Sequence, residues 1–358
     1  MKFFNLDLHI SVIADIKNIF QDLGHEVDDW TLSGHSWVMG RTPDKVDIIN
    51  ANNWRSLDKD LCDAFYKRYK DELDQYDGFI CTYAPSFCLL YEKFKKPIIT
   101  VVPIRYEAPF WNNKEKWEWY NQYLRDGIDN GLIIPIANNK CDKEYCEVYT
   151  QREWKHIPSL CKYTESVYEP KQSSFLYHSL LPLRMLSHDP LIQNKKAALG
   201  PNYKWHELTE YRGMIHIPYN ISTMSIFENY TSGMPMFFPS LEFILKLRKS
   251  FGNRGVLSQL SWREVQGLPA GTILASNNNI KNLNNYGDIE EERPWIELAD
   301  FYDKEWMPYI NYFDSFPELS AMLNSVDTLA VSQNMLSFNK IRKQRIYHLW
   351  EEVLKELA

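Results

Sequence analysis

Short apolar runs alternate with longer amphipathic segments along the first half of the chain. Apolar runs bounded by turn residues are typical of buried parallel strands, whereas apolar positions three and four residues apart indicate a helix. The expected strands are residues 1–8, 25–32, 78–83, 97–103 and 132–137, and the expected helices are residues 12–23, 54–76, 85–94, 114–126 and 142–149. This repeated alternation predicts an α/β fold with a mostly parallel sheet.

The alternation lapses at residues 157–172, where two prolines and the sequence KQSS are typical of a linker. A strand–helix pattern resumes beyond it. The sequence therefore predicts two Rossmann-like domains, residues 1–165 and 172–335, followed by a C-terminal helix at residues 336–358.

The second half of the chain is less regular than the first. Its expected strands are residues 174–177, 214–217 and 236–238, and its expected helices are residues 206–211, 224–231, 241–249, 318–326 and 334–357. Residues 180–204 follow no regular pattern. The polar run at residues 277–294 is typical of a surface loop.

Composition narrows the class of protein. The chain has 358 residues and a net charge of −7, which argues against nucleic acid as a partner. Asp7 and His9 interrupt the first apolar run too early for a signal peptide, and no apolar stretch is long enough for a transmembrane segment. The six cysteines form no CxxC pair, so free thiols and a cytoplasmic location are expected.

Two kinds of cofactor site are missing from the sequence. The fingerprint GxGxxG is absent, so a dinucleotide cofactor is not expected. No pair of acidic residues follows a strand in a DxD-like arrangement, and no His or Cys residues cluster, so no metal site is expected.

The most informative stretch is residues 213–240, GMIHIPYNISTMSIFENYTSGMPMFFPS. It predicts a strand, a loop, a helix, a turn and a second strand. Ser222 or Thr223 can cap the helix, Gly233 can adopt the left-handed conformation after it, and Pro235 prevents its continuation. Polar groups therefore gather at the carboxyl end of the first strand, where open α/β sheets bind ligands.

This stretch resembles the donor-binding segment of GT-B glycosyltransferases. The residues that carry the resemblance are Pro218 in the loop, Glu228 on the helix, and Gly233 and Pro235 in the turn. In that family, the glutamate at the position of Glu228 usually holds the ribose of the nucleotide. Many retaining members have a further glutamate where this chain has Asn220, so the resemblance leaves retaining and inverting chemistry open.

The resemblance implies two Rossmann-like domains that face each other across a cleft. Residues 1–165 would bind the acceptor, residues 172–335 would bind the nucleotide sugar, and residues 336–358 would form a helix that packs back on the N-terminal domain. The implied reaction moves a sugar from a nucleotide-diphosphate sugar, most often a UDP- or GDP-sugar, to a hydroxyl of a carbohydrate or glycoconjugate. Such enzymes generally need no bound metal or other cofactor.

His9 and Asp7 are the candidate catalytic residues. They follow the first strand directly, so they are expected at the carboxyl edge of the N-terminal sheet. An imidazole suits general-base work near neutral pH, and Asp7 is either a rival base or the partner that orients His9. Capping of the first helix by Asp7 is the structural alternative.

Donor binding is expected mainly around residues 218–225. Hydroxyl and N–H groups at a helix N-terminus suit a phosphate, although capping alone needs only one hydroxyl. The predicted donor-binding residues are Tyr219, Asn220, Ser222, Thr223, Ser225, Glu228, His178 and Arg184. Lys195, Lys196 and Lys204 are alternatives to Arg184 as the cation for the diphosphate.

Acceptor binding is expected in loops that follow the N-terminal strands. The predicted acceptor-binding residues are His35, Tyr83, Arg105 and Glu107. An exposed loop histidine, a core tyrosine and an ordinary Arg–Glu salt bridge are the structural alternatives.

Two other functions fit the same two-domain pattern. One is a nucleotide-sugar epimerase, which would need several carboxylates in the cleft. The other is a non-catalytic protein that binds a sugar or a nucleotide.

Overall fold

The computed structural model describes residues 1–103, 106–110, 113–181, 186–251, 255–258 and 289–357. These residues divide into two compact units. We call residues 1–159 and 346–357 unit 1, and residues 160–258 and 289–345 unit 2. Arg105 and Arg184, which the sequence proposes as binding residues, lie outside the described residues.

Unit 1 is built on a six-stranded sheet in the order β2-β1-β3-β4-β5-β6. Its strands are β1 (Lys2–Asp7), β2 (Glu26–Thr31), β3 (Gly78–Cys81), β4 (Ile98–Val102), β5 (Ile133–Ala137) and β6 (Lys155–His156). Every neighbouring pair is parallel, which confirms the sheet that the alternation predicted. Strands β3, β4 and β5 are fully buried, which explains why their sequences are continuously apolar.

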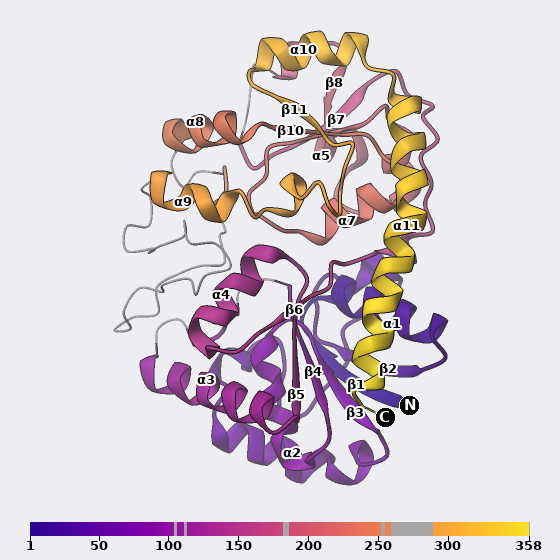
Figure 1. Ribbon diagram of the computed structural model, residues 1–358. Coiled ribbons are helices and arrows are strands. Elements are labelled where there is room, and N and C mark those ends of the chain that lie inside the picture. Colours follow the sequence, from indigo (N-terminus) through magenta and orange to yellow (C-terminus); the bar gives the residue numbers. More distant parts are fainter. Residues whose placement is uncertain (104–105, 111–112, 182–185, 252–254, 259–288, 358) are drawn as a thin grey trace. The chain divides into compact units, whose positions relative to one another are not determined.

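Helices and 3-10 turns connect the strands of unit 1. They are α1 (Ile10–Asp22), η1 (Ser36–Met39), η2 (Trp54–Ser56), α2 (Lys59–Leu73), η3 (Pro85–Phe94), α3 (Lys114–Asp129) and α4 (Lys140–Thr150). Figure 1 shows α1 on one side of the strands and α3 on the other. Two expected helices differ from the prediction, because residues 85–94 form a 3-10 helix and the helix after Trp54 begins only at Lys59, capped by Asp58.

Unit 2 contains a five-stranded sheet in the order β11-β10-β9-β7-β8. Its strands are β7 (Phe175–His178), β8 (Ile192–Asn194), β9 (Met214–His216), β10 (Met236–Pro239) and β11 (Asn311–Phe313), and all neighbouring pairs are parallel. Both sheets thus place their first strand beside their second and their third. The strand order reverses there, at β1 and β3 in unit 1 and at β7 and β9 in unit 2, and ligands of open α/β sheets bind outside such a point.

The helices of unit 2 surround its strands (Figure 1). They are η4 (Lys162–Thr164), η5 (Leu186–His188), α5 (Lys195–Leu199), α6 (Trp205–Thr209), α7 (Met224–Thr231), α8 (Leu241–Phe251), α9 (Ile289–Ile296), η6 (Asp300–Tyr302), α10 (Phe316–Ser325) and α11 (Thr328–Lys355). The last residues of α11 belong to unit 1, where Trp350 packs edge-on against Phe20 with ring centroids 5.2 Å apart.

Two expectations for unit 2 are wrong. Residues 180–204 are not wholly irregular, since they contain β8 and α5, which are too short to show a period. The polar run at 277–294 includes the start of α9, whose acidic residue Glu292 is buried against Arg248. Charged residues in a sequence usually indicate a surface loop, so a charged residue that forms a buried ion pair is easily assigned to a loop.

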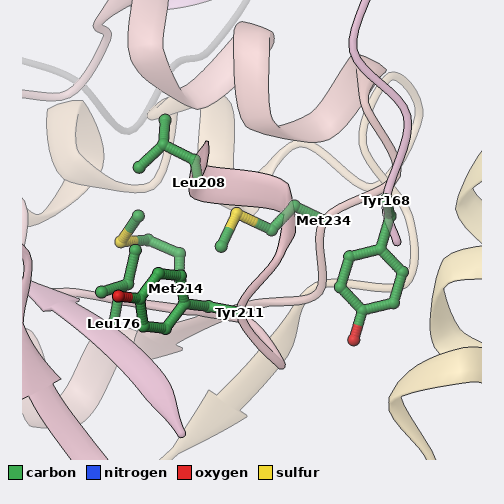
Figure 2. Close-up of a cluster of buried hydrophobic side chains, with 6 residues drawn as sticks. All are labelled: Tyr168, Leu176, Leu208, Tyr211, Met214 and Met234. Carbon is green, nitrogen blue, oxygen red and sulfur yellow. The ribbon is translucent and has the colours of Figure 1, made fainter. Parts of the chain in front are cut away.

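Figure 2 shows the buried cluster that joins α6 to the sheet of unit 2. Its members are Tyr168, Leu176, Leu208, Tyr211, Met214 and Met234. Trp205, at the start of α6, packs against this cluster. Gly233, expected to be left-handed, has φ +76°, and a Cβ there would lie 2.6 Å from Leu336 of α11.

The predicted fold class is confirmed as α/β with two Rossmann-like parallel sheets. The arrangement of the domains across a cleft stays a prediction. Among the described helices, none is both long and apolar enough to cross a membrane.

Candidate functional site

The carboxyl ends of β1 and β3 bring His9 and Tyr83 together in unit 1. The backbone N–H of Leu8 donates to the carbonyl oxygen of Tyr83 at 2.7 Å, which joins the two loops. The rings of His9 and Tyr83 meet edge to face with centroids 6.4 Å apart, and both side chains are half-buried. The ring of Trp54 also meets that of Tyr83 edge to face, with centroids 6.3 Å apart.

Asp7 is fully buried at the end of β1. The hydroxyl of Thr31 donates to its Oδ1 at 3.3 Å, and Asp7 does not cap α1, whose N-cap is His9. Burial, followed by the charge of Asp29, raises the pKa of the Asp7 carboxyl well above its ordinary value. A neutral carboxyl accepts a proton poorly, so the surroundings of Asp7 disfavour it as the base.

Asp7→Asn is expected to stabilise the protein at neutral and alkaline pH. The folded state holds the proton of Asp7 more tightly than the unfolded state, so wild-type stability is lost as pH rises from about 4 towards the raised pKa. Asparagine does not ionise, so the stability of the variant does not fall in this way. The difference in unfolding free energy between the variant and the wild type should therefore grow by about 1.4 kcal/mol for each pH unit in that window. Urea unfolding of both proteins between pH 5 and pH 8 measures the difference. A constant difference across this range would show that Asp7 ionises normally.

The remaining acceptor-binding candidates of unit 1 occupy different environments. His35 is exposed at the N-cap of η1, and its backbone N–H donates to the Ser33 hydroxyl at 3.2 Å. Glu107 is only 2% exposed, and its charge contributes, after burial and Asp142, to raising the pKa of Cys146. Glu107 therefore lies beneath the surface of unit 1.

Two histidines and a tyrosine meet at the corresponding point of unit 2, where β7 and β9 end. The ring of His178 lies 6.0 Å from that of His216 and 6.2 Å from that of Tyr219. His216, which the sequence analysis did not single out, stacks on Phe238 with a centroid distance of 4.8 Å and contacts Asn229 at 3.4 Å. A histidine within an apolar strand was the signal that could have revealed it.

Both histidines of unit 2 are neutral at physiological pH. Burial, together with the charge of Lys195, lowers the pKa of His178 to about 4. Burial lowers the pKa of His216 well below its ordinary value, and His178 and Lys195 add to the effect. Neither imidazole therefore supplies positive charge, which at this point of unit 2 comes from Lys195.

Helix α7 begins beside these residues, and the side chain of its N-cap residue does not cap it. Its N-cap is Thr223, whose hydroxyl lies 3.0 Å from that of Ser225, and its first turn has no acidic residue. Side chains cap six other long helices of the described chain: α2 by Asp58, α3 by Asn113, α4 by Asn139, α8 by Ser240, α10 by Ser315 and α11 by Asp327. Helix α1 is like α7, because its N-cap residue His9 makes no capping hydrogen bond either. An uncapped N-terminus carries partial positive charge that suits an anion.

The loop before α7 contains a buried amide group. Asn220 is fully buried, and its Oδ1 accepts a hydrogen bond from the backbone N–H of Ile221 at 2.8 Å. Its Nδ2 has no hydrogen-bond partner among the residues that the structure describes. Ser222 is also buried, whereas Tyr219 is half-buried. A buried donor without a partner is unusual in a folded protein and is consistent with a ligand or water at this loop.

Glu228 lies one turn into α7, between two aromatic side chains. The hydroxyl of Tyr163 donates to its Oε1 at 2.6 Å, and the rings of Tyr163 and Trp205 meet edge to face with centroids 5.5 Å apart. Burial raises the pKa of Glu228, while hydrogen bonds from Tyr163 and Trp205 and the charge of Lys195 oppose this. The sequence analysis missed both aromatic residues, and Tyr163 lay within the expected linker.

Lys195 is the cation that the structure places near these groups. Its Nζ donates to the hydroxyl of Tyr203 at 2.8 Å and lies 4.6 Å above the ring of that residue. Its charge acts on His178, His216 and Glu228. Lys195 was one of the alternatives to Arg184.

A cavity of about 270 Å³ opens where β10 ends. It is lined by Ser240, Leu241, Glu297, Tyr302, Lys304 and Tyr312. The hydroxyl of Tyr302 donates to the carbonyl of Pro239 at 2.8 Å, and that of Tyr312 donates to the carbonyl of Phe301 at 2.5 Å. Phe301, next to Tyr302 in the chain, stacks on Phe238, which stacks on His216 at the end of β9.

No group of three or more His, Cys, Asp or Glu residues suited to a metal ion occurs among the residues that the structure describes.

No family model and no curated protein matches the sequence. Similar solved structures include Anabaena HepE in complex with UDP and glucose, at 10% identity, 99% coverage of both chains and a TM-score of 0.47. The kitacinnamycin glycotransferase is 10% identical, and the match covers 100% of this chain and 99% of that protein with a TM-score of 0.47. The spinosyn forosaminyltransferase SpnP is 11% identical, and the match covers 100% of this chain and 99% of that protein with a TM-score of 0.45.

Proposed function

We propose that the protein is a GT-B glycosyltransferase that moves a sugar from a nucleotide-diphosphate sugar to a hydroxyl of a carbohydrate or glycoconjugate. The observation that carries this proposal is the pairing of two features on one helix. The N-cap residue Thr223 does not cap the N-terminus of α7 with its side chain, and the carboxylate of Glu228 follows one turn later. An anion site and a hydroxyl-binding carboxylate at this spacing match the diphosphate and the ribose of one donor molecule.

In this proposal, unit 2 binds the donor. The first turn of α7 and the ammonium group of Lys195 neutralise the diphosphate, which carries the charge of the leaving group. Glu228 accepts hydrogen bonds from the ribose, and Tyr163 and Trp205 hold its carboxylate in place. The cavity beyond β10 has room for a sugar ring, and its tyrosine rings suit stacking.

Unit 1 supplies the base if the reaction inverts the configuration of the sugar. His9 is half-buried at the end of β1, at the point where the strand order reverses. It can remove the proton of the attacking hydroxyl, whereas burial raises the pKa of the Asp7 carboxyl and so favours its protonated form, which cannot act as a base.

We also propose that the reaction needs no metal and takes place in the cytoplasm. A helix N-terminus and a lysine supply the positive charge that a divalent cation provides in other transferases. All six cysteines are buried free thiols, which fits a reducing compartment.

Calorimetric titration with UDP and GDP, in buffer containing excess EDTA, tests the donor site. The wild type is expected to bind one of these nucleotides without metal, and Glu228→Ala should weaken binding by about 1–3 kcal/mol through loss of a charged hydrogen bond. Glu169→Ala is the matched control, because Glu169 is a largely exposed glutamate of the same unit. Binding that requires a metal, or equal affinities in the wild type and Glu228→Ala, would contradict the assignment.

A further inference from the structure

The turn that follows β2 presents an exposed tryptophan. Trp37 lies in η1 and is 40% exposed. It is the one exposed tryptophan among those that the structure describes, since the others are buried or half-buried. Exposing a ring of this size to water is unfavourable, so its position requires an explanation.

Hydrogen bonds tie this turn to the end of β1. The backbone N–H of Leu32 donates to the carbonyl oxygen of Asp7 at 2.8 Å. The hydroxyl of Thr31, which donates to Asp7, also accepts from the N–H of Ser33 at 3.2 Å, and the N–H of Ser36 donates to the carbonyl of Ser33 at 3.2 Å. The turn therefore lies at the same sheet edge as His9, one strand away.

The turn is also fixed in its conformation. Ser36, next to Trp37, is 1% exposed, and Gly40 closes the turn with φ +66°. Arg41 follows the turn and forms salt bridges with Asp29 and, at 3.1 Å, with Asp44. Lys17 forms a second salt bridge with Asp29 at 2.7 Å. Because its neighbours are anchored, the fold keeps Trp37 partly exposed.

The surroundings of Trp37 fit a sugar ring better than a membrane or a protein partner. Trp37 is the one exposed large apolar side chain in the described part of unit 1, whereas membrane and protein interfaces need a contiguous apolar patch. Its exposed neighbours in the sequence are Gly34, His35 and Gly40. One exposed aromatic ring, with an exposed hydrogen-bonding side chain two residues away in the same turn, suits the apolar face and polar edge of a pyranose.

We propose that Trp37 and His35 form a carbohydrate-binding subsite of unit 1, in which a pyranose ring of the acceptor stacks on the indole of Trp37. The acceptor is then a glycan or glycoside rather than an acceptor without a sugar. This inference rests on the proposed function, which it deepens by naming the residues that bind a sugar ring of the acceptor.

Fluorine NMR of protein labelled with 5-fluorotryptophan tests the subsite directly. Comparison with Trp37→Phe identifies the signal of Trp37. The probes are maltose, cellobiose, lactose and mannobiose, each titrated in the presence of saturating UDP or GDP. At least one disaccharide should shift the Trp37 signal, and Trp37→Ala should weaken its binding about tenfold through loss of stacking.

Leu329→Ala is the matched control, because it removes an exposed apolar side chain from unit 2. It should leave disaccharide binding unchanged. A Trp37 signal that no disaccharide shifts, or that shifts only with phosphatidylglycerol vesicles, would overturn the subsite. If no disaccharide shifts the signal but the wild type binds UDP or GDP in the same samples, only the subsite is refuted. If the wild type binds neither nucleotide, the proposed function itself is refuted.

Discussion

His9→Ala is expected to lower kcat by roughly 10²–10⁴-fold, if the transfer inverts the configuration of the sugar, while leaving nucleotide affinity almost unchanged. The imidazole lies at the carboxyl end of β1, half-buried against Tyr83, whereas the residues proposed to bind the donor belong to unit 2. Removing a base affects the transition state of the transfer but not the binding of the nucleotide. Turnover is measured with a nucleotide sugar and a glycoside acceptor, and nucleotide affinity is measured in parallel by calorimetry.

Asp7→Asn is the control for this experiment. Asparagine has nearly the shape of the neutral carboxyl that burial favours at Asp7, so turnover should stay within a few-fold of the wild type. If Asp7→Asn loses activity and His9→Ala does not, the base is Asp7 and the ionisation argued for it is wrong. Normal turnover in both variants would mean that the base lies elsewhere or that the reaction retains configuration.

Glu292→Gln is expected to lower the free energy of unfolding of unit 2 by about 3–5 kcal/mol, the usual cost of leaving a buried charge unpaired. Arg248 of α8 and Glu292 of α9 are 3% and 0% exposed, and two hydrogen bonds of 3.0 Å join them. Arg248 also donates to the carbonyl of Val256 at 3.1 Å. The variant keeps the shape of the side chain but removes its charge, so the buried guanidinium loses the negative charge of Glu292.

The same two helices provide a matched control. Arg293 of α9 pairs with Glu242 of α8, but this pair is solvent-accessible. Glu242→Gln should therefore change stability little, because exposed ion pairs contribute little. The urea midpoint of unit 2, followed by tryptophan fluorescence, measures both variants. Equal midpoints would show that the buried pair is not desolvated, and the double variant Arg248→Met/Glu292→Leu should recover most of the lost stability.

Local periodicity was enough to predict most elements of the fold. The helix expected at residues 224–231 is α7 with the same bounds, because an amphipathic run lies between turn residues and a left-handed glycine. The buried strands of unit 1 were equally clear, since both faces of a parallel strand are covered and its sequence is continuously apolar. Elements shorter than a period, such as β8 and β11, gave no signal.

The sequence by itself determined the fold class and the residues that follow β1, β3, β7 and β9, because chain order places them at the carboxyl ends of strands. Only the tertiary structure decided which of these residues meet and in which protonation state. It buried Asp7, made His178 and His216 neutral, and brought Tyr163 and Trp205 to Glu228 from distant parts of the chain. Strand order, burial and long-range contacts determine these protonation states and contacts. All three depend on residues far apart in the sequence, so no local sequence pattern reveals them.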